Sequence, residues 1–249
     1  MNNRLEDRAA SLGPSAGRVA MFVDGTPQAG TRRPGRPRNR GPSAEYTARL
    51  AEIVDVAAKV FKERGYDAGS LDDVAAELNL RKASLYYYVR SKAELLYLIF
   101  DKTITSALDS IEKCLSIQDP RERLAALIRH QVIMVASEPS FFTVFFDQRP
   151  RLARNYDSEI LAKEKQYLRV YQEAVATAVD NGVLAPMSAR YGAQAILGMT
   201  SWIYKWFDPD RDDPRAFADA CVDMIMVGGD GRRILAGGKA ARGPEPRKG

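Results

Sequence analysis

The chain has 249 residues, 45% of them hydrophobic, and a formal net charge of +5. This length allows one large domain or two modest ones, and the hydrophobic fraction is ample for a packed core. There is no run of about eighteen apolar residues and the N-terminus is polar, so we expect a cytoplasmic protein with neither a membrane span nor a secretion signal. Cys114 and Cys221 lie far apart within helical patterns, which favours buried thiols over a disulfide.

The positive charge is concentrated in the first part of the chain. Residues 1–92 contain 16 Lys and Arg against 11 Asp and Glu, whereas the remaining residues contain 21 of each. This distribution is typical of a nucleic-acid-binding region followed by a neutral region, although a small excess over ninety residues is not diagnostic by itself.

Five arginines and two prolines occur in the segment TRRPGRPRNRG at residues 31–41. Such a segment cannot bury apolar area, so we expect residues 1–44 to be a disordered basic arm. Its Gly35-Arg36-Pro37-Arg38 core resembles the AT-hook, in which an extended Arg-Pro-Arg enters the minor groove. Arg36 and Arg38 are therefore candidate DNA contacts, and the alternative is a basic tail attracted to phosphates without sequence preference.

Three short helices are predicted between residues 45 and 92. The first has an apolar stripe from Leu50 to Phe61 and ends at Gly65. The second begins with a capping box of Ser70 and Asp73, and Asn79 provides the left-handed residue of a tight corner. The third runs from Arg81 to Tyr88, with Leu85 and Val89 facing inward.

The outward face of the third helix carries two cations, a hydroxyl and three phenols. This composition suits contacts with phosphates and base edges, and a helix-turn-helix fits the DNA major groove. The alternative is a solvated helix whose tyrosines fill the core. The candidate DNA-binding residues of this region are Arg81, Lys82, Ser84, Tyr86, Tyr87, Tyr88 and Lys92.

The order and spacing of these residues resemble the TetR family of bacterial repressors. The shared motif covers residues 47–96 and comprises Ser70, Val74, Ala75, Asn79–Leu80, Lys82, Ser84, Leu85–Tyr86, Tyr88 and Ser91–Leu95. The resemblance implies that Tyr86 and Lys92 hold phosphates and that Lys82, Ser84, Tyr87 and Tyr88 lie at the groove. The chain departs from the family at Asn79 (usually Gly), at Arg81 (usually Ser or Thr, the N-cap) and at Val89 (commonly Phe).

The remaining sequence predicts further helices with clear boundaries. Ser91 and Glu94 start one helix, Asp119-Pro120 starts the next, and Glu138-Pro139 interrupts it. Later helices are expected over 158–180, from Ser188 to Phe207, and from Asp213-Pro214 to about Val227, with a disordered tail over 229–249. Sustained strand patterns are absent from the sequence.

Aromatic and methionine residues are dense after residue 93, more than a small helical core needs. A largely apolar ligand pocket explains the surplus, and ordinary core packing is the alternative. The candidate ligand-binding residues are Phe100, Ile104, Phe142, Phe145, Phe146, Tyr167, Tyr171, Met199 and Trp202.

The last two predicted helices combine small and large residues, which allows close helix crossing. The TetR resemblance implies that this pair forms the four-helix bundle of a homodimer, and intramolecular packing is the alternative. The Phe-rich segment 141–146 and Trp202 to Trp206 also resemble family members that sense acyl-CoA thioesters in lipid or steroid breakdown. Arg149, Arg151 and Arg154 are then candidate partners of a CoA phosphate, or simply a salt-bridged surface.

The sequence gives little support to an enzyme. His130 is the only histidine, and it has no cysteine or carboxylate cluster at metal-ligand spacing. A nucleophilic triad cannot be assembled, and we expect no metal or cofactor.

These patterns together predict an all-α protein. We expect a helix-turn-helix DNA-binding domain over residues 45–92 and a ligand-binding and dimerisation domain over residues 93–228. The expected function is that of a homodimeric repressor that binds palindromic double-stranded DNA and is released by a small, largely apolar effector, with an acyl-CoA as one candidate. A repressor without an effector and a DNA-binding architectural protein are the alternatives.

Overall fold

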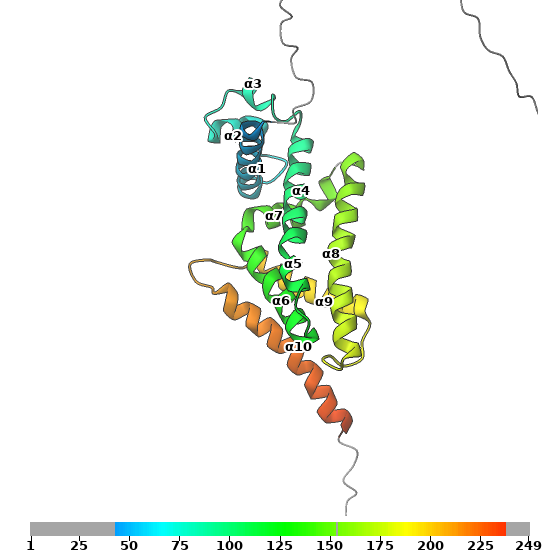
Figure 1. The fold of residues 1–249 in the computed structure, drawn as a ribbon. Coiled ribbons are helices and arrows are strands. Elements are labelled where there is room, and N and C mark those ends of the chain that lie inside the picture. The colour runs from blue at the N-terminus through cyan, green and yellow to red at the C-terminus, as the bar shows by residue number, and fades with distance from the viewer. Residues whose placement is uncertain (1–42, 153, 238–249) are drawn as a thin grey trace, which may run out of the picture. The chain divides into compact units, whose positions relative to one another are not determined.

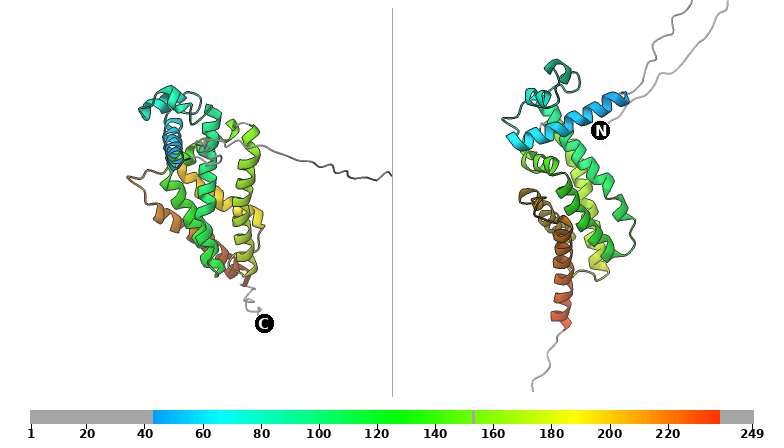
Figure 2. Two further views of the ribbon diagram at one scale, coloured as in Figure 1. Left: turned by 45° about the horizontal axis from the view of Figure 1, so that its top comes forward. Right: turned by 90° about the vertical axis from the view of Figure 1, so that its left-hand side faces the viewer.

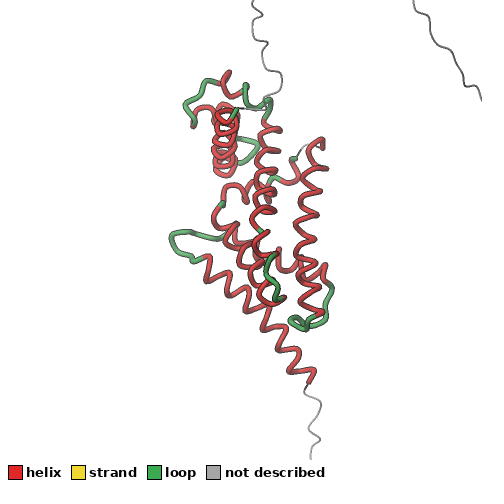
Figure 3. The backbone as a smooth tube through the Cα atoms, in the orientation of Figure 1, coloured by secondary structure: helices red, strands yellow, loops and turns green. Residues whose placement is uncertain are grey.

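The computed structural model describes residues 43–152 and 154–237, and within these ranges every regular element is helical (Figures 1 and 3). The chain divides into two units, 1–41 and 42–249, and all described residues belong to the second. The expected all-α class is therefore confirmed. The elements are α1 (Ala44–Arg64), α2 (Leu71–Glu77), α3 (Lys82–Leu85), α4 (Lys92–Ser110), α5 (Glu112–Leu115), α6 (Pro120–Ser137), α7 (Pro139–Asp147), η1 (Arg149–Arg151), α8 (Arg154–Asp180), α9 (Ala189–Ser201), η2 (Trp202–Lys205) and α10 (Pro214–Gly237).

Helices α1, α2 and α3 form a small unit around a shared apolar core. Helix α1 buries Ile53, Ala57 and Phe61, and it ends at Gly65, whose φ of 77° suits a residue without a Cβ. Val74 of α2 is fully buried, as are Leu85 and Val89, the predicted inward pair. The third helix of the unit is held by these two side chains, so its other side chains are left to solvent.

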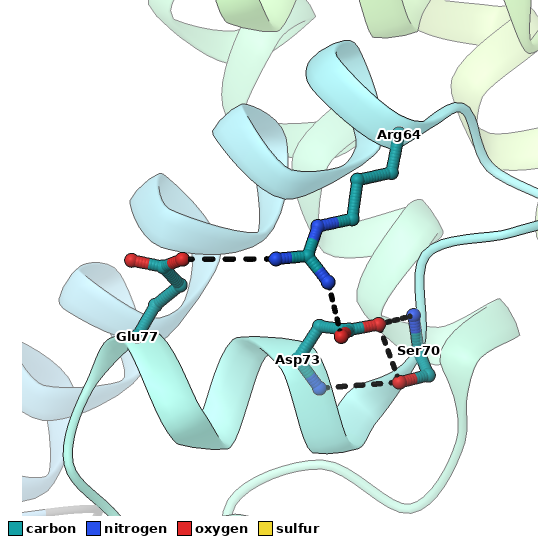
Figure 4. Close-up of polar contacts among 4 residues, drawn as sticks. All are labelled: Arg64, Ser70, Asp73 and Glu77. Atoms are coloured by element: carbon teal, nitrogen blue, oxygen red, sulfur yellow. Dashed lines mark hydrogen bonds and ion pairs between the residues drawn. The ribbon is translucent and has the colours of Figure 1, made fainter.

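The predicted capping box at the start of α2 is present (Figure 4). The Asp73 backbone N–H donates to Ser70 Oγ at 3.1 Å, and the Ser70 backbone N–H donates to Asp73 Oδ2 at 2.8 Å. Arg64, at the end of α1, pairs with the other oxygen of Asp73 and lies 3.9 Å from Glu77. The hydrogen bonds lower the pKa of Asp73, and Arg64 adds to this effect. The same carboxylate therefore starts α2 and joins it to α1.

The corner between α2 and α3 has the predicted geometry. Asn79 adopts a φ of 52°, and the Leu80 N–H donates to the Ala75 carbonyl at 2.8 Å. Helix α3 is shorter than predicted: it ends at Leu85, and the chain continues through turns to Tyr88. Arg81 makes no capping bond with its side chain, which agrees with the loss of the usual Ser or Thr at this position.

The remaining helices pack around α4, α6 and α8 (Figures 1 and 2). As predicted, Asp119 caps α6 by accepting from the Glu122 N–H at 2.8 Å, Pro120 lies in its first turn, and the helix ends before Pro139. Pro139 also begins α7, a helix that the sequence did not predict. Helix α7 packs against both α1 and α4. The helix-turn-helix unit and the following helices therefore share one continuous core.

Besides the end of α3, three further boundaries differ from the sequence predictions. Helix α8 begins at Arg154 and not at residue 158, and the helix expected from Ser188 to Phe207 narrows to a 3-10 turn after Ser201. Helix α10 continues to Gly237, where a disordered tail was expected from residue 229. A glycine costs a helix only about 1 kcal/mol, and the helix-forming segment RRILA follows the glycines, so the helix continues.

Cys114 and Cys221 are free and buried, as predicted. Over residues 43–152 and 154–237, none of the helices has the length and hydropathy of a membrane span. The same residues contain no group of three or more His, Cys, Asp or Glu side chains placed to bind a metal ion.

Candidate nucleic-acid interface and internal cavity

The turn-and-helix segment after the corner presents most of the predicted DNA-binding side chains to solvent. Tyr87 is 73% exposed and Tyr86 is 46% exposed, and Arg81, Lys82 and Ser84 are also exposed. Tyr88 is only half-buried. The alternative, in which these tyrosines fill the core, does not hold for Tyr86 and Tyr87.

A concave surface of about 440 Å³ lies beside this segment, between the loop before α2 and the start of α4. Tyr86 and Lys92, the two residues expected to hold phosphates, both line it, together with Lys82 and Arg90. Three cations and a phenol therefore border one hollow, together with Asp67 and Asp72. The cations outnumber the carboxylates, and cations and phenols are groups that contact a phosphate backbone.

Lys92 is held in place by contacts on two sides. Its Nζ donates to the Asp67 carbonyl at 3.1 Å and lies 4.4 Å from the ring centre of Tyr66 and 5.7 Å from that of Phe61. Burial lowers the pKa of Lys92, with opposing contributions from nearby carboxylates. A partly desolvated ammonium gains from a phosphate neighbour, which replaces the solvation that the rings exclude.

Lys82 has a different environment. Its Nζ donates to Asp72 at 2.8 Å, which raises the pKa of Lys82. Because both side chains are largely exposed, this ion pair is weak and leaves the Lys82 ammonium available to other partners.

Tyr46, in the first turn of α1, was not predicted from the sequence. Its ring stacks on the ring of Tyr88, with 5.0 Å between the ring centres, and contacts the ring of Tyr87 edge-on at 5.8 Å. The rings of Tyr87 and Tyr88 also contact each other edge-on, with 5.2 Å between their centres. The contacts among the three rings orient Tyr87, the most exposed of the three.

Arg90 was also missed, because one exposed arginine at the end of a helical pattern carries no distinguishing signal. Arg36 and Arg38, the predicted minor-groove contacts, lie outside the described residues.

A cavity of about 130 Å³ lies among α4, α6, α7, α8 and α9. Its walls are mostly apolar, and five of the nine predicted ligand-binding residues line it. The lining residues are Thr103, Ile104, Ala107, Gln131, Met134, Phe142, Phe145, Phe146, Glu164, Tyr167, Leu168, Leu197 and Ser201.

Four predicted ligand-binding residues do not line this cavity. Phe100 packs behind Phe145, with 4.9 Å between the ring centres, and Tyr171 is buried behind Tyr167, with 5.4 Å between the ring centres. Met199 is half-buried elsewhere, and Trp202 is 59% exposed on the outer surface. Aromatic density indicated the region, but the helix face decides which side chains reach the cavity.

The arginines considered for a CoA phosphate are engaged with carboxylates. Arg149 donates to both oxygens of Glu164, at 2.9 and 3.0 Å, and to Asp157 at 2.6 Å, and these contacts raise its pKa. Arg151 pairs with Asp67, in the loop before α2. For these two residues the structure favours the salt-bridged surface; the Arg154 side chain lies outside the described residues.

His130, on α6, shows no sign of a metal site. Its Nδ1 is buried without a hydrogen-bond partner, and burial lowers its pKa. Both features are those of a histidine kept neutral by its packing.

Two family models match the chain. The model described as "Bacterial regulatory proteins, tetR family" matches residues 53–97, and the model described as "Tetracyclin repressor-like, C-terminal domain" matches residues 118–228. The first therefore covers the helix-turn-helix, and the second covers most of the helices that surround the cavity.

Among curated proteins, the chain is 29% identical over 105 residues to the biofilm operon negative transcriptional regulator IcaR of Staphylococcus aureus. The match covers 42% of the chain and 50% of IcaR, so the chain spans half the length of the curated relatives it matches.

Solved structures match over a longer range. The structure of AibR in complex with isovaleryl coenzyme A and operator DNA is 30% identical with a TM-score of 0.68, and the match covers 72% of this chain and 98% of AibR. The ketosteroid transcriptional regulator KstR2 of Mycobacterium tuberculosis has the same fold, with 21% identity, a TM-score of 0.68 and coverage of 72% and 94%.

The two family models and the full-length match to AibR agree with the helix-turn-helix and with the helical arrangement that follows it. The chain belongs to the TetR family of transcriptional regulators, and it is not an enzyme.

Proposed function

We propose that the protein is a cytoplasmic, dimeric repressor that binds a palindromic operator and is released by a small, largely apolar effector. Residues 45–92 bind DNA, and residues 93–228 hold the effector and the dimer. The observation that carries this proposal is the hollow beside α3, where Lys82, Tyr86 and Lys92 converge, together with a cavity bounded by α4. The AibR structure, which contains both an acyl-CoA and operator DNA, supports it.

The residues of the interface divide into two roles. Tyr86, Arg90 and Lys92 border the hollow and hold phosphates, which fixes the position of the protein on the duplex. Arg81, Lys82, Ser84 and Tyr87, which lie on α3 or directly before and after it, face the base edges, with Tyr88 behind Tyr87. Lys82 also borders the hollow, so it stands between the two groups. The arm with Arg36 and Arg38 adds contacts in the minor groove.

The dimer is proposed to form through α9 and α10. Tyr191, Ala195 and Trp202 follow one another at spacings of four and seven residues on the exposed side of α9 and η2. Ala220 and Met224 are four residues apart on the exposed side of α10. Other members of the predicted pair face inward: Gly192, Ile203 and Cys221 are buried in the protein's own core. The exposed apolar residues that remain form a self-complementary surface of the kind used by two-fold dimers.

Release follows from the course of α4. This helix begins at Lys92, beside the phosphate hollow, and lines the cavity at Thr103, Ile104 and Ala107. Eleven residues of helix separate Lys92 from Thr103, about 17 Å, so a tilt of about 10° displaces the start of α4 by about 3 Å. Operator half-sites lie about 34–36 Å apart, and a displacement in each subunit disengages one recognition helix.

The energy required is modest. An effector that binds the displaced state about a hundredfold more tightly supplies about 2.7 kcal/mol, within the usual range of allosteric coupling.

Selection of operators from random DNA with the purified full chain tests the proposal. We expect a palindrome with half-sites about one helical turn apart, and a footprint on it that resists nonspecific competitor DNA. Binding to all sequences alike would instead indicate an architectural protein. A thermal shift screen with fatty acids, acyl-CoAs and drugs tests for an effector, because ligand binding raises the apparent stability.

A further inference from the structure

The polar groups on the cavity wall form one connected chain of hydrogen bonds. The Tyr167 hydroxyl donates to Gln131 Oε1 at 2.5 Å, and Gln131 Nε2 donates to Ser201 Oγ at 2.9 Å. Behind them the Tyr171 hydroxyl donates to the Leu127 carbonyl at 3.0 Å. Burial raises the pKa of Tyr167, so its phenol keeps its proton and remains a donor.

This chain fixes which hydrogen-bonding groups remain for a ligand. Gln131 uses its carbonyl to accept from Tyr167, and Ser201 uses its oxygen to accept from Gln131. Two donor hydrogens are not used by these bonds: the Ser201 hydroxyl proton and the second amide proton of Gln131. The described residues provide no acceptor for either of them.

The other polar residues on the wall are already engaged. The Thr103 hydroxyl donates to the Ile99 carbonyl at 2.7 Å, and both carboxylate oxygens of Glu164 accept from Arg149. A donor without a partner in an apolar site is costly, more so than a spare lone pair. The cavity therefore calls for a ligand that brings an acceptor oxygen to Ser201 and Gln131.

The cavity is partly open, so its size limits the part of the ligand that it encloses. An apolar cavity of about 150 Å³ accommodates benzene, a molecule with six heavy atoms. The cavity of about 130 Å³ is therefore filled by about six heavy atoms, and its aromatic and aliphatic lining requires most of them to be apolar.

We propose that the buried part of the effector is a short acyl group of about five carbons whose carbonyl oxygen accepts hydrogen bonds from Ser201 and Gln131. The inference rests on the proposed function, because it specifies the effector of that same cavity. A thioester of coenzyme A and a small free ester share this chemistry, and binding experiments distinguish the two sources.

Calorimetric titration of the full chain tests both the size and the carbonyl. The probes are isovaleryl-CoA, its thioether analogue without the carbonyl oxygen, palmitoyl-CoA, free CoA and ethyl isovalerate. We expect isovaleryl-CoA to bind about a hundredfold more tightly than the thioether, because the thioether loses both hydrogen bonds, and more tightly than palmitoyl-CoA. If ethyl isovalerate binds as tightly as isovaleryl-CoA, the acyl group comes from a free ester. If ethyl isovalerate binds more weakly than isovaleryl-CoA, the acyl group comes from the coenzyme A thioester.

Two serine variants make the test specific. Ser201→Ala should lower the affinity for isovaleryl-CoA about tenfold and leave the affinity for the thioether unchanged. Ser137→Ala is the matched control, because Ser137 is exposed on α6, donates to the Ile133 carbonyl and lies outside the cavity lining. Circular dichroism of both variants confirms that they are folded.

Three results would overturn the inference: equal affinities for thioester and thioether, tighter binding of palmitoyl-CoA, or no effect of Ser201→Ala on isovaleryl-CoA. Absence of binding to any short acyl compound also overturns it. In each case the proposed function is judged separately, by whether the wild-type chain selects a palindromic operator and whether another compound releases it.

Discussion

At the scale of single residues, the side chains proposed to contact DNA differ in the contacts that hold them. Lys92 is positioned by a carbonyl and two aromatic rings, so its ammonium is fixed before DNA arrives. Lys82, at the start of α3, pairs with the exposed Asp72, and Tyr87, in the turn after α3, contacts the half-buried ring of Tyr46. Fixed groups suit the uniform phosphate backbone, and groups that exchange partners suit the variable base edges.

Substitutions should separate these two roles. Lys92→Ala should weaken binding to all DNA sequences alike and lower the slope of affinity against salt by about one charge, and Tyr86→Phe should weaken all sequences without changing that slope. Lys82→Ala and Tyr87→Ala should instead relax base preference, at about 1–3 kcal/mol per base. Fluorescence anisotropy with the selected operator and single-base variants measures both quantities.

Lys113→Ala serves as a charge-matched control, because Lys113 is exposed on α5, away from the hollow. If all four interface variants change affinity and base preference in the same way, the division of roles is wrong.

His130 should make the stability of the fold depend on pH. Burial lowers its pKa below the ordinary value of 6.5, so between these two values the unfolded chain binds more protons than the folded one. The free energy of unfolding should therefore fall as the pH drops below 6.5. Since the chain has one histidine, His130→Leu should remove this dependence above the range where carboxylates titrate. Urea denaturation between about pH 7 and pH 5 measures the free energy of unfolding of both proteins. If the two plots of this free energy against pH are parallel, the prediction is wrong.

At the scale of helices and turns, the sequence predicted where helices begin better than where they end. The capping residues Ser70, Ser91 and Asp119 bond to backbone groups three residues away, so the signal is local and readable. The ends of α3 and α10 depend on packing and on the summed preferences of many residues, which no single residue signals.

The cavity shows the same limit of prediction from local sequence signals. The aromatic-rich region was predictable, and Ile104, Phe142 and Tyr167 do line the cavity. Trp202 is 59% exposed, at the residue where α9 gives way to the 3-10 turn η2. Membership of a cavity depends on how five helices pack together, which the order of residues does not specify.

Asn79 tests the corner between α2 and α3. A residue with a Cβ is strained at a φ of 52° by about 1–2 kcal/mol, and asparagine and glycine tolerate this conformation best. Asn79→Ala should therefore lower the free energy of unfolding by about 1 kcal/mol, and Asn79→Gly, the usual family residue, should change it by only a few tenths. Thermal and urea denaturation measure the two differences, and an alanine variant as stable as the wild type would show that the corner is not strained.

At the scale of the whole molecule, the exposed apolar side of α9 and α10 should form the dimer. Met224 is 69% exposed and lies on the same side of α10 as Ala220, so Met224→Arg should produce monomers by placing charge in an apolar interface. Operator affinity should fall steeply, because a monomer engages one half-site. Sedimentation velocity and DNA binding check both effects.

Leu115→Arg is the control for the dimer test, because Leu115 is equally apolar and 42% exposed, but lies on α5. A Met224→Arg protein that remains dimeric would exclude this surface as the interface.

The η1 turn offers a second connection between the cavity and the DNA-binding helices. Arg149 holds Glu164 of the cavity wall, and Arg151, two residues later, pairs with Asp67, whose carbonyl accepts from Lys92. The Arg151–Asp67 pair is largely exposed and contributes less than about 1 kcal/mol to stability. Its removal should therefore leave folding nearly unchanged and act mainly on the coupling between effector and operator.

We expect the Arg151→Ala variant to bind the effector alone and the operator alone with nearly wild-type affinity. The factor by which the effector reduces operator affinity should be two- to fivefold smaller than in the wild type, a loss of about 0.5–1 kcal/mol of coupling free energy. Arg151→Lys keeps the charge and should restore part of the loss. Arg129→Ala is the control, because it removes another exposed ion pair, to Asp219 on α10. Operator titrations with and without saturating effector measure the coupling. If Arg151→Ala retains all of it, the tilt of α4 alone transmits the signal, because α4 is then the remaining element that contacts both the cavity and the phosphate hollow.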